Sequence, residues 1–362
     1  MMEKLRANLR IIWAITAKDL LEGLRNKSAI GVILSALFVV VLYRYLPMLT
    51  EANEPLRLLI YDAGDATLVP ILENSPAFDV YTYATAERVE ELLALDGDSQ
   101  KLGLMIPANY DDVVAERGEP ELTVYLMRWL SGEEAQEILQ AVEGEIAALT
   151  GVSAQLVEQR VELAPEGIGG GLMPAVGMVF VTLMIGMTVP THLMLEEKQT
   201  KTLAALLVSP ATAGQIALGK ALTGLTYALL GVGVAFVFNN ALISHGWLTL
   251  LVAMLSALLS VGLGLLLGML LDSRQQLMLW AWVLLIPLTI PMFLSIMEDL
   301  VPANLIAVFR FIPTVVQFEL FRVSFAGPIT VSDWAPRSLL LLGWAVAVLG
   351  IVVWLLRRSD RR

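Results

Sequence analysis

Cysteine is absent from the 362 residues of this chain, and histidine occurs only twice, at His192 and His245. Without cysteine there can be no disulfide bond, no thiolate metal site and no cysteine nucleophile. Two histidines so far apart in the sequence also argue against a histidine-based metal or acid–base cluster. We therefore expect neither a metal site nor a catalytic residue on this chain.

Charged residues are scarce as well, at 16% of the chain, while hydrophobic residues reach 57%. Soluble domains average about 25% charged and roughly 45–50% apolar residues. The mean hydropathy of the chain is +0.70. Much of this sequence therefore needs a lipid environment in place of water.

The few charges are unevenly distributed along the chain. Residues 51–171 contain 24 acidic and 6 basic side chains, whereas the remaining residues contain 11 acidic and 18 basic ones. An acidic block without basic patches does not suit nucleic acid, because its phosphates are bound by lysine and arginine. The two parts of the chain are therefore expected to face different environments.

Long apolar runs make up most of the remainder. Each run is close to the ~20 residues that a helix needs to cross the hydrocarbon core of a membrane. The first run follows a basic segment, residues 1–28, and is too long for a signal-peptide core, so we expect it to remain as an anchor. The sequence predicts an α-helical integral membrane protein with about six transmembrane helices, at residues 29–48, 172–195, 216–238, 247–271, 277–297 and 338–356.

Basic residues indicate which side of the membrane each connection faces, because cytoplasmic loops carry an excess of lysine and arginine. Basic residues precede the first apolar run. They also occur in the connection between the second and third predicted helices, at Lys198 and Lys220, and after the last run, at Arg357 and Arg358. Both termini are therefore expected in the cytoplasm. Residues 49–171 would form an extracytoplasmic domain, and residues 172–362 a five-helix transmembrane domain.

The acidic residues 49–171 alternate between strand and helix patterns, which is typical of a mixed α/β domain. About 120 residues can bury a core of their own. The longest helix is expected between Ser131 as N-cap and Gly151 beyond its end. Strands are predicted at LRLLIYD, FDVYTY, KLGLMIP and ELTVYLM, with QLVEQRVELAP as a further extended segment.

Residues 298–337 are apolar but do not have the pattern of a transmembrane helix. They contain Arg310, Glu319 and Arg322, and they are interrupted by Pro302 and Pro313. One charge at the centre of a membrane helix costs roughly 2.5–3.5 kcal/mol, so a full span is not predicted. We expect short helices that lie at the outer surface or dip back into the membrane.

The connection after the second predicted helix reads EEKQTKTLAALLVSPATAGQIALGK, residues 196–220, and is longer than a polar turn requires. Its apolar residues are spaced by three and four, so they would form one face of a short helix before a Ser-Pro stop. Three interpretations remain open on periodicity alone. The helix could dock into a groove of a partner protein, it could lie on the inner leaflet, or it could be a frayed end of the second span.

This connection, together with the order of the elements along the whole chain, resembles the signature of type-2 ABC exporter permeases with a large outer domain between the first two spans. In that family the segment, here 196–215, is the coupling helix that receives the movement of the ATPase subunit. Lys201 and Ala204 depart from the pattern, where the family has glycine and glutamate. The matching positions are Glu196, Glu197, Thr202, Leu203, Leu206, Leu207, Ser209, Pro210, Gly219 and Lys220.

The resemblance implies the permease subunit of an ATP-driven exporter in a bacterial or archaeal cytoplasmic membrane, paired with a second permease as a homodimer or heterodimer. ATP and Mg²⁺ would bind to a separate ABC ATPase subunit, so this chain would hold no cofactor and would not be an enzyme by itself. GQIALGKA, residues 214–221, matches a phosphate-binding GxxxxGK, but Ala221 stands where a hydroxyl is required. The alternative is a membrane-anchored receptor or scaffold whose outer domain senses or assembles.

Overall fold

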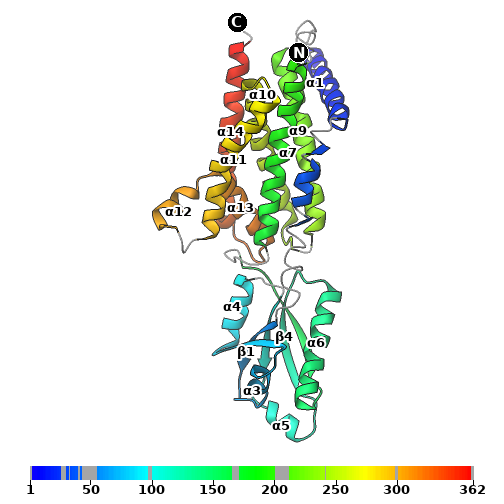
Figure 1. Ribbon diagram of the computed structural model, residues 1–362, viewed down its shortest axis with the longest axis vertical. Helices are drawn as coiled ribbons and strands as arrows, with labels where there is room; N and C mark the ends of the chain where they lie inside the picture. Colours follow the sequence, from blue (N-terminus) through cyan, green and yellow to red (C-terminus); the bar gives the residue numbers. More distant parts are fainter. Residues whose placement is uncertain are drawn as a thin grey trace.

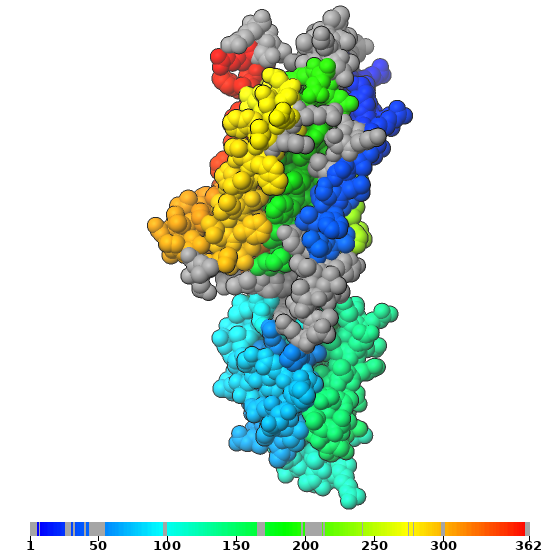
Figure 2. Space-filling model, in the orientation of Figure 1, coloured from blue at the N-terminus to red at the C-terminus, as the bar shows by residue number. Residues whose placement is uncertain are grey.

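The molecule is elongated and has two parts (Figure 1). One is built on a β-sheet (the sheet domain, residues 55–164), and the other is a bundle of long helices (the helical bundle). Figure 2 shows the two parts stacked end to end along the long axis. The computed structural model describes residues 2–25, 30–31, 33–39, 41–42, 55–96, 100–164, 171–199, 212–240, 242–297 and 301–359.

The sheet domain contains one five-stranded sheet in the order β2-β1-β3-β4-β5. Strand β1 runs parallel to both β2 and β3, β4 is antiparallel to β3, and β5 is parallel to β4. All five predicted extended segments are therefore confirmed. Their bounds are β1 (Leu56–Asp62), β2 (Phe78–Tyr83), β3 (Lys101–Ile106), β4 (Glu121–Met127) and β5 (Gln155–Val161).

The register places aliphatic side chains side by side on one face of the sheet. Leu58 pairs with Leu102, and Leu104 pairs with Val124, and all four are at most 1% exposed. Because successive side chains of a strand point to opposite faces, the residues between them form a second face. Gly103 belongs to that second face together with Tyr125, its partner across β3 and β4.

Four helices cover the sheet, and they lie on both of its faces. Residues Val89 and Leu93 of α4 approach Gly103 so closely that a Cβ there would lie 2.8 and 3.0 Å from them. Helix α6 lies on the opposite side of the sheet from α4 (Figure 1), and α3 packs against α6. The bounds are α3 (Leu68–Glu73), α4 (Ala86–Asp96), α5 (Tyr110–Ala115) and α6 (Gly132–Thr150).

The ends of α6 confirm the predicted caps. Ser131 accepts a hydrogen bond from the backbone N–H of Glu134, and the Glu134 side chain accepts one from the N–H of Ser131, so both form a capping box. Gly151 ends the helix at φ 72°, in the left-handed region that only glycine occupies without strain. The local sequence thus defines this helix before any tertiary contact is considered.

The helical bundle contains five helices that are long and apolar enough to cross a membrane, or up to six if one bent pair is counted as a span. These five include all the predicted segments after residue 171, which confirms the α-helical membrane class. The predicted first span, 29–48, falls partly outside the described residues; those described between 30 and 42 are helical. The long helices are α7 (Leu172–Gln199), α9 (Ala213–Phe238), α10 (Gly246–Leu270), α11 (Arg274–Ile296) and α14 (Val331–Ser359).

Helices α7 and α10 make the closest contact of the bundle through glycine. The backbone carbonyl of Met187 lies directly against Gly264, where no Cβ would fit, and a Cβ at Gly268 would meet the Met194 sulfur at 2.8 Å. The Thr191 hydroxyl also donates to the Gly264 carbonyl at 2.7 Å. The Gly264-x-x-x-Gly268 pair therefore serves packing within one subunit, as glycines at this spacing commonly do in membranes.

Residues 303–325 form two short helices, α12 (Ala303–Phe309) and α13 (Pro313–Phe325), bent by 85° relative to each other. Nearly every side chain of α13 is buried in the bundle, so it does not lie at a surface; it has the form of the predicted segment that dips back. The bend coincides with Pro313 at the first turn of α13. The last predicted helix also begins earlier than expected, at Val331, and continues through Pro336.

Two connections at one end of the bundle hold the sheet domain in place. Arg128, just after β4, donates to the Ser244 hydroxyl between α9 and α10 at 2.5 Å. The backbone N–H of Gly327, between α13 and α14, donates to the Leu163 carbonyl at 2.9 Å. The sheet domain is therefore anchored to the loops beside α10 and α13.

Candidate coupling site

The predicted coupling segment joins α7 to α9 along the chain, and the described ends of these helices that flank it lie at the end of the bundle far from the sheet domain (Figure 1). Six of the nine predicted site residues fall outside the described residues, and their role stays a prediction: Thr202, Leu203, Leu206, Leu207, Ser209 and Pro210. Glu196 and Glu197 belong to the last turns of α7, and the Glu196 side chain is half-buried. Lys220 lies in α9.

Helix α7 is fixed where it enters this segment. The Lys198 ammonium donates to the carbonyls of Met269 and Leu271, at 3.1 and 2.8 Å, and to the Asp272 carboxylate at 3.1 Å. These carbonyls belong to the C-terminal end of α10, where unpaired carbonyls and the helix dipole favour a cation. Lys198 therefore joins the end of α7 to the end of α10.

Helix α9 is fixed where the chain leaves the segment. Thr212 is its N-cap: the Thr212 hydroxyl accepts from the N–H of Gln215, and the Gln215 side chain accepts from the N–H of Thr212 at 2.8 Å. The same Gln215 side chain donates to the Asn8 side chain of α1 (Met2–Gly23) at 2.9 Å. Both flanks of the segment are thus tied to other helices.

Helix α1 lies along α9 and touches it through small and hydroxyl-bearing residues. Thr16 donates to the carbonyl of Gly219 at 3.2 Å, and Tyr227 donates to the carbonyl of Leu20 at 2.6 Å. A Cβ at Gly219 would lie 2.6 Å from the Ile15 side chain, so the two backbones approach closely. We call these contacts, together with Asp19–Lys220, the α1–α9 contact.

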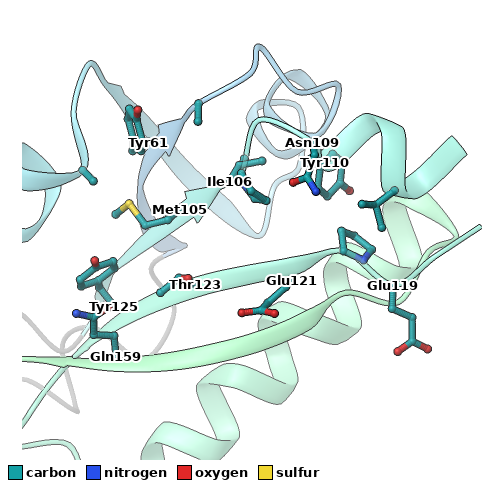
Figure 3. Close-up of a pocket in the computed structure, with 15 residues that line it drawn as sticks. Tyr61, Met105, Ile106, Asn109, Tyr110, Glu119, Glu121, Thr123, Tyr125 and Gln159 are labelled. Atoms are coloured by element: carbon teal, nitrogen blue, oxygen red, sulfur yellow. The ribbon is translucent and has the colours of Figure 1, made fainter. Parts of the chain in front are cut away.

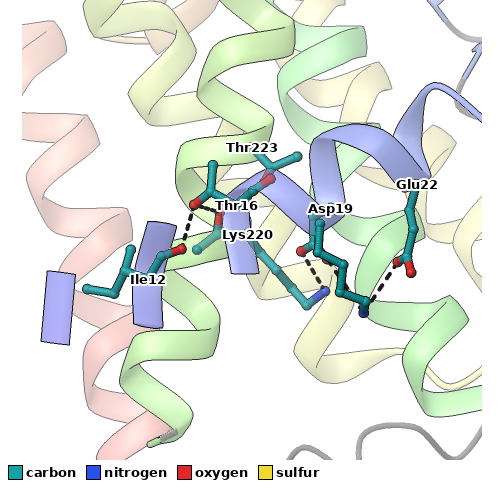
Figure 4. Close-up of polar contacts among 8 residues, drawn as sticks. Ile12, Thr16, Asp19, Glu22, Lys220 and Thr223 are labelled. Carbon is teal, nitrogen blue, oxygen red and sulfur yellow. Dashed lines mark hydrogen bonds and ion pairs between the residues drawn. The ribbon is translucent and has the colours of Figure 1, made fainter. Parts of the chain in front are cut away.

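A buried ion pair lies at the centre of the α1–α9 contact (Figure 4). The Lys220 ammonium is 3.1 Å from the Asp19 carboxylate, and the two side chains are 1% and 0% exposed. Lys18 lies 4.0 Å from the second carboxylate oxygen of Asp19. A charge buried in this way is tolerated because its opposite charge is buried with it. The Lys220 ammonium is therefore enclosed within this chain, and its role in coupling stays a prediction.

The helical conformation also excludes the phosphate-binding interpretation of residues 214–221. These residues form the first turns of α9, so their backbone N–H groups after the first turn are engaged in the helix. A phosphate-binding loop instead needs a run of N–H groups that point at the ligand. Among the described residues, no group of three or more acidic or histidine side chains is arranged to hold a metal ion.

A family model described as "ABC-2 family transporter protein" matches residues 27–356 of this chain. The chain belongs to the ABC-2 transporter family. Its members are membrane subunits of ABC transporters, so the protein is a multi-pass membrane permease whose family works with an ABC ATPase subunit. No curated protein matches the sequence closely enough to count as a relative.

Asp19, Thr16 and Tyr227 of this ABC-2 permease are not among the residues predicted from sequence. One signal pointed to Asp19: Lys220 stands beside an apolar run, where a buried cation needs a carboxylate. The segment 1–28 has three acids, Glu3, Asp19 and Glu22. Only the packing of α1 on α9 selects Asp19 among them, because the two partners are 201 residues apart.

Proposed function

We propose that this ABC-2 permease is the transmembrane subunit of an ATP-driven exporter, and that residues 196–215 receive the movement of a separate ATPase subunit. The observation that carries the proposal is the fixation of both flanks of that segment. Lys198 ties α7 to the end of α10, and Asp19–Lys220 ties α9 to α1. A force on the segment would therefore be passed to four helices at once.

Rigid connection is the physical requirement for such a role. A force is transmitted only through elements that move as one body, because packed helices have discrete arrangements and do not deform continuously. The segment between Gln199 and Thr212 is short, and each end enters a helix within one residue. A partner that moves this segment would thus act directly on the ends of α7 and α9.

Further parts of the proposal rest on the charge pattern and the family. We place both termini and residues 196–215 in the cytoplasm of a bacterial or archaeal cell, with residues 49–171 outside, because the basic residues follow the positive-inside rule. We also place ATP and Mg²⁺ on the ATPase subunit and pair this chain with a second permease, as a homodimer or heterodimer. Transport is proposed to run outward, by alternating access.

A receptor or scaffold without transport is the alternative function. Its clearest difference from a transporter is the effect of cargo on ATP hydrolysis. Reconstituted with its ATPase subunit in vesicles, the exporter should hydrolyse ATP faster when its cargo is supplied. A receptor should bind its ligand without any ATPase partner. A gene for an ATP-binding cassette protein next to the gene for this chain would argue against the receptor function.

The coupling assignment can be tested by replacing Leu206 and Leu207 with aspartate. We expect co-purification with the ATPase subunit to be lost, because two charges would prevent an apolar helix face from docking. Leu149→Asp, in the sheet domain, places the same charge on an already exposed leucine and should leave co-purification unchanged. Unchanged co-purification of the Leu206→Asp and Leu207→Asp double variant would remove the assignment.

A further inference from the structure

A cavity of about 620 Å³ opens on the sheet domain, far from the candidate coupling site. This volume falls within the roughly 300–1,000 Å³ that small-molecule sites occupy. The cavity lies on the face of the sheet that α4 contacts at Gly103, and Figure 3 shows Tyr61, Met105, Thr123 and Tyr125 along it. Tyr61, Met105 and Thr123 form one row of its floor, because they pair directly across β1, β3 and β4.

The topology of the sheet places this cavity where ligands bind in open α/β sheets. Strand β1 has parallel neighbours on both sides, β2 and β3. The chain runs from β1 through α3 to β2, and then from β2 through α4 to β3. Since α3 and α4 lie on opposite faces, the carboxyl ends of β1 and β3 form a topological switch point. Ligands characteristically bind in the crevice outside the strands at such a point. Ala63 and Pro107, immediately after these two strands, line the cavity.

The lining of the cavity indicates the charge of its ligand. It includes two carboxylates, Glu119 and Glu121, and no basic side chain. Both carboxylates are exposed. Glu121 begins β4 on the same face as Thr123 and Tyr125, because alternate residues of a strand point together, and Glu119 lies two residues before it (Figure 3). The helices α4 and α5 begin at the cavity, but each has an acid in its first turn, so their dipoles do not favour an anion.

The remaining lining is largely apolar and aromatic, with the polar side chains of Asn109, Thr123 and Gln159 among it. Tyr61 and Tyr125 are half-buried and stand beside Met105 at one end of the cavity (Figure 3). The faces of tyrosine rings attract cations as well as apolar groups. Burial raises the pKa of Tyr125, and the nearby carboxylates of Glu90 and Glu87 raise it further.

We propose that this cavity binds an organic cation with an apolar body, such as a quaternary ammonium or phosphonium compound. The apolar body would lie on Tyr61, Met105 and Tyr125, and the charge would face Glu119 and Glu121. The surrounding domain strengthens this preference, because residues 51–171 contain 24 acidic and 6 basic side chains and therefore attract cations. The proposal concerns binding to the sheet domain and does not depend on coupling to an ATPase.

The test uses two ions of the same shape and opposite charge, tetraphenylphosphonium and tetraphenylborate. Isothermal titration of the full chain in detergent, with empty micelles as the blank, would measure their affinities. We expect saturable binding of tetraphenylphosphonium only. The Glu119→Gln and Glu121→Gln double variant should weaken it about tenfold or more, because two charges near a surface site contribute several-fold each.

The control is a Glu137→Gln and Glu143→Gln double variant, which removes the same charge from exposed positions of α6, across the sheet. It should change the affinity less than about twofold, since these charges are farther from the cavity and are screened. Thr123→Lys is an independent test. It places a positive charge on the cavity floor, which should abolish the binding of tetraphenylphosphonium. Equal affinity for both ions, no binding of either, or equal effects of the two double variants would overturn the proposal.

Discussion

In the sheet domain, Arg88 and Glu91 form an ion pair in which the side chains are 52% and 56% exposed. In the helical bundle, Asp19 and Lys220 form an ion pair with side chains 0% and 1% exposed. Water already solvates the first pair, so forming it changes the free energy of folding little. The second pair has lost its water completely, and each charge depends on the other.

The comparison separates two uses of charge within one chain. Exposed acidic residues give the sheet domain its negative field without determining its fold, which depends on aliphatic rows such as Leu58 and Leu102. In the α1–α9 contact the charge fixes which turn of α1 faces which turn of α9. A shift of one turn would move Asp19 and Lys220 apart by about 5 Å along the helix axis. The buried pair therefore determines position more than stability.

Loss of one partner from the buried pair should have the largest effect. Replacing Lys220 with methionine would remove the buried partner of the Asp19 carboxylate and leave the half-exposed Lys18 at 4.0 Å, and should lower the free energy of unfolding by about 3–5 kcal/mol. Denaturant titration in detergent measures it. Adding Asp19→Leu should recover most of the loss, because both charges are then gone. A double variant as unstable as Lys220→Met would contradict this account.

A bulkier residue at the closest approach of α1 and α9 should have an intermediate effect. Gly219→Val would place a branched side chain against Ile15, where even a Cβ would lie 2.6 Å from its Cγ2 atom. Overpacking of this kind costs about 1–3 kcal/mol. Limited proteolysis should then release α1 faster than in the unmodified protein.

Gly233→Val is the matched control on the same helix, because a Cβ at Gly233 would meet no atom within 4 Å. It carries the same change in helix propensity and should leave the release of α1 unchanged. Faster release in both variants would mean that valine weakens α9 itself, and that contact with α1 is not the cause.

Loss of the exposed pair should have the smallest effect. Glu91→Gln removes the partner of Arg88 on the surface of α4 and should change the free energy of unfolding by less than about 1 kcal/mol. The difference should shrink further at high salt, which screens exposed charges. If this substitution were as costly as Lys220→Met, exposure would not be what distinguishes the two ion pairs.

Elements with strong local signals were predicted well from the sequence. The five strands of the sheet domain and the caps of α6 follow from alternation, Ser131 and Gly151, which act through neighbouring residues. The long helices after residue 171 follow from uninterrupted apolar runs. In each case a few adjacent residues determine the conformation, so no knowledge of the rest of the chain is needed.

Elements that depend on distant partners were missed or remained ambiguous. Helix α1 was expected only as a polar basic segment, because its buried residues, such as Ile15 and Thr16, are few and lie against α9 about two hundred residues away. For α13, charges such as Glu319 suggested a surface position. The structure pairs Glu319 with Arg337 of α14, at 2.7 Å, while nearly every other side chain of α13 is buried.

By itself, the sequence determined the membrane class, the alternating elements of the acidic domain and the resemblance to an ABC permease, because each depends on composition or on short-range spacing. Only the tertiary structure decided that Lys220 is buried against Asp19, and that β1 and β3 end side by side above an acidic, tyrosine-lined cavity. Both features join residues far apart in the chain. Their contacts are selected by packing and by strand order, which no local pattern contains.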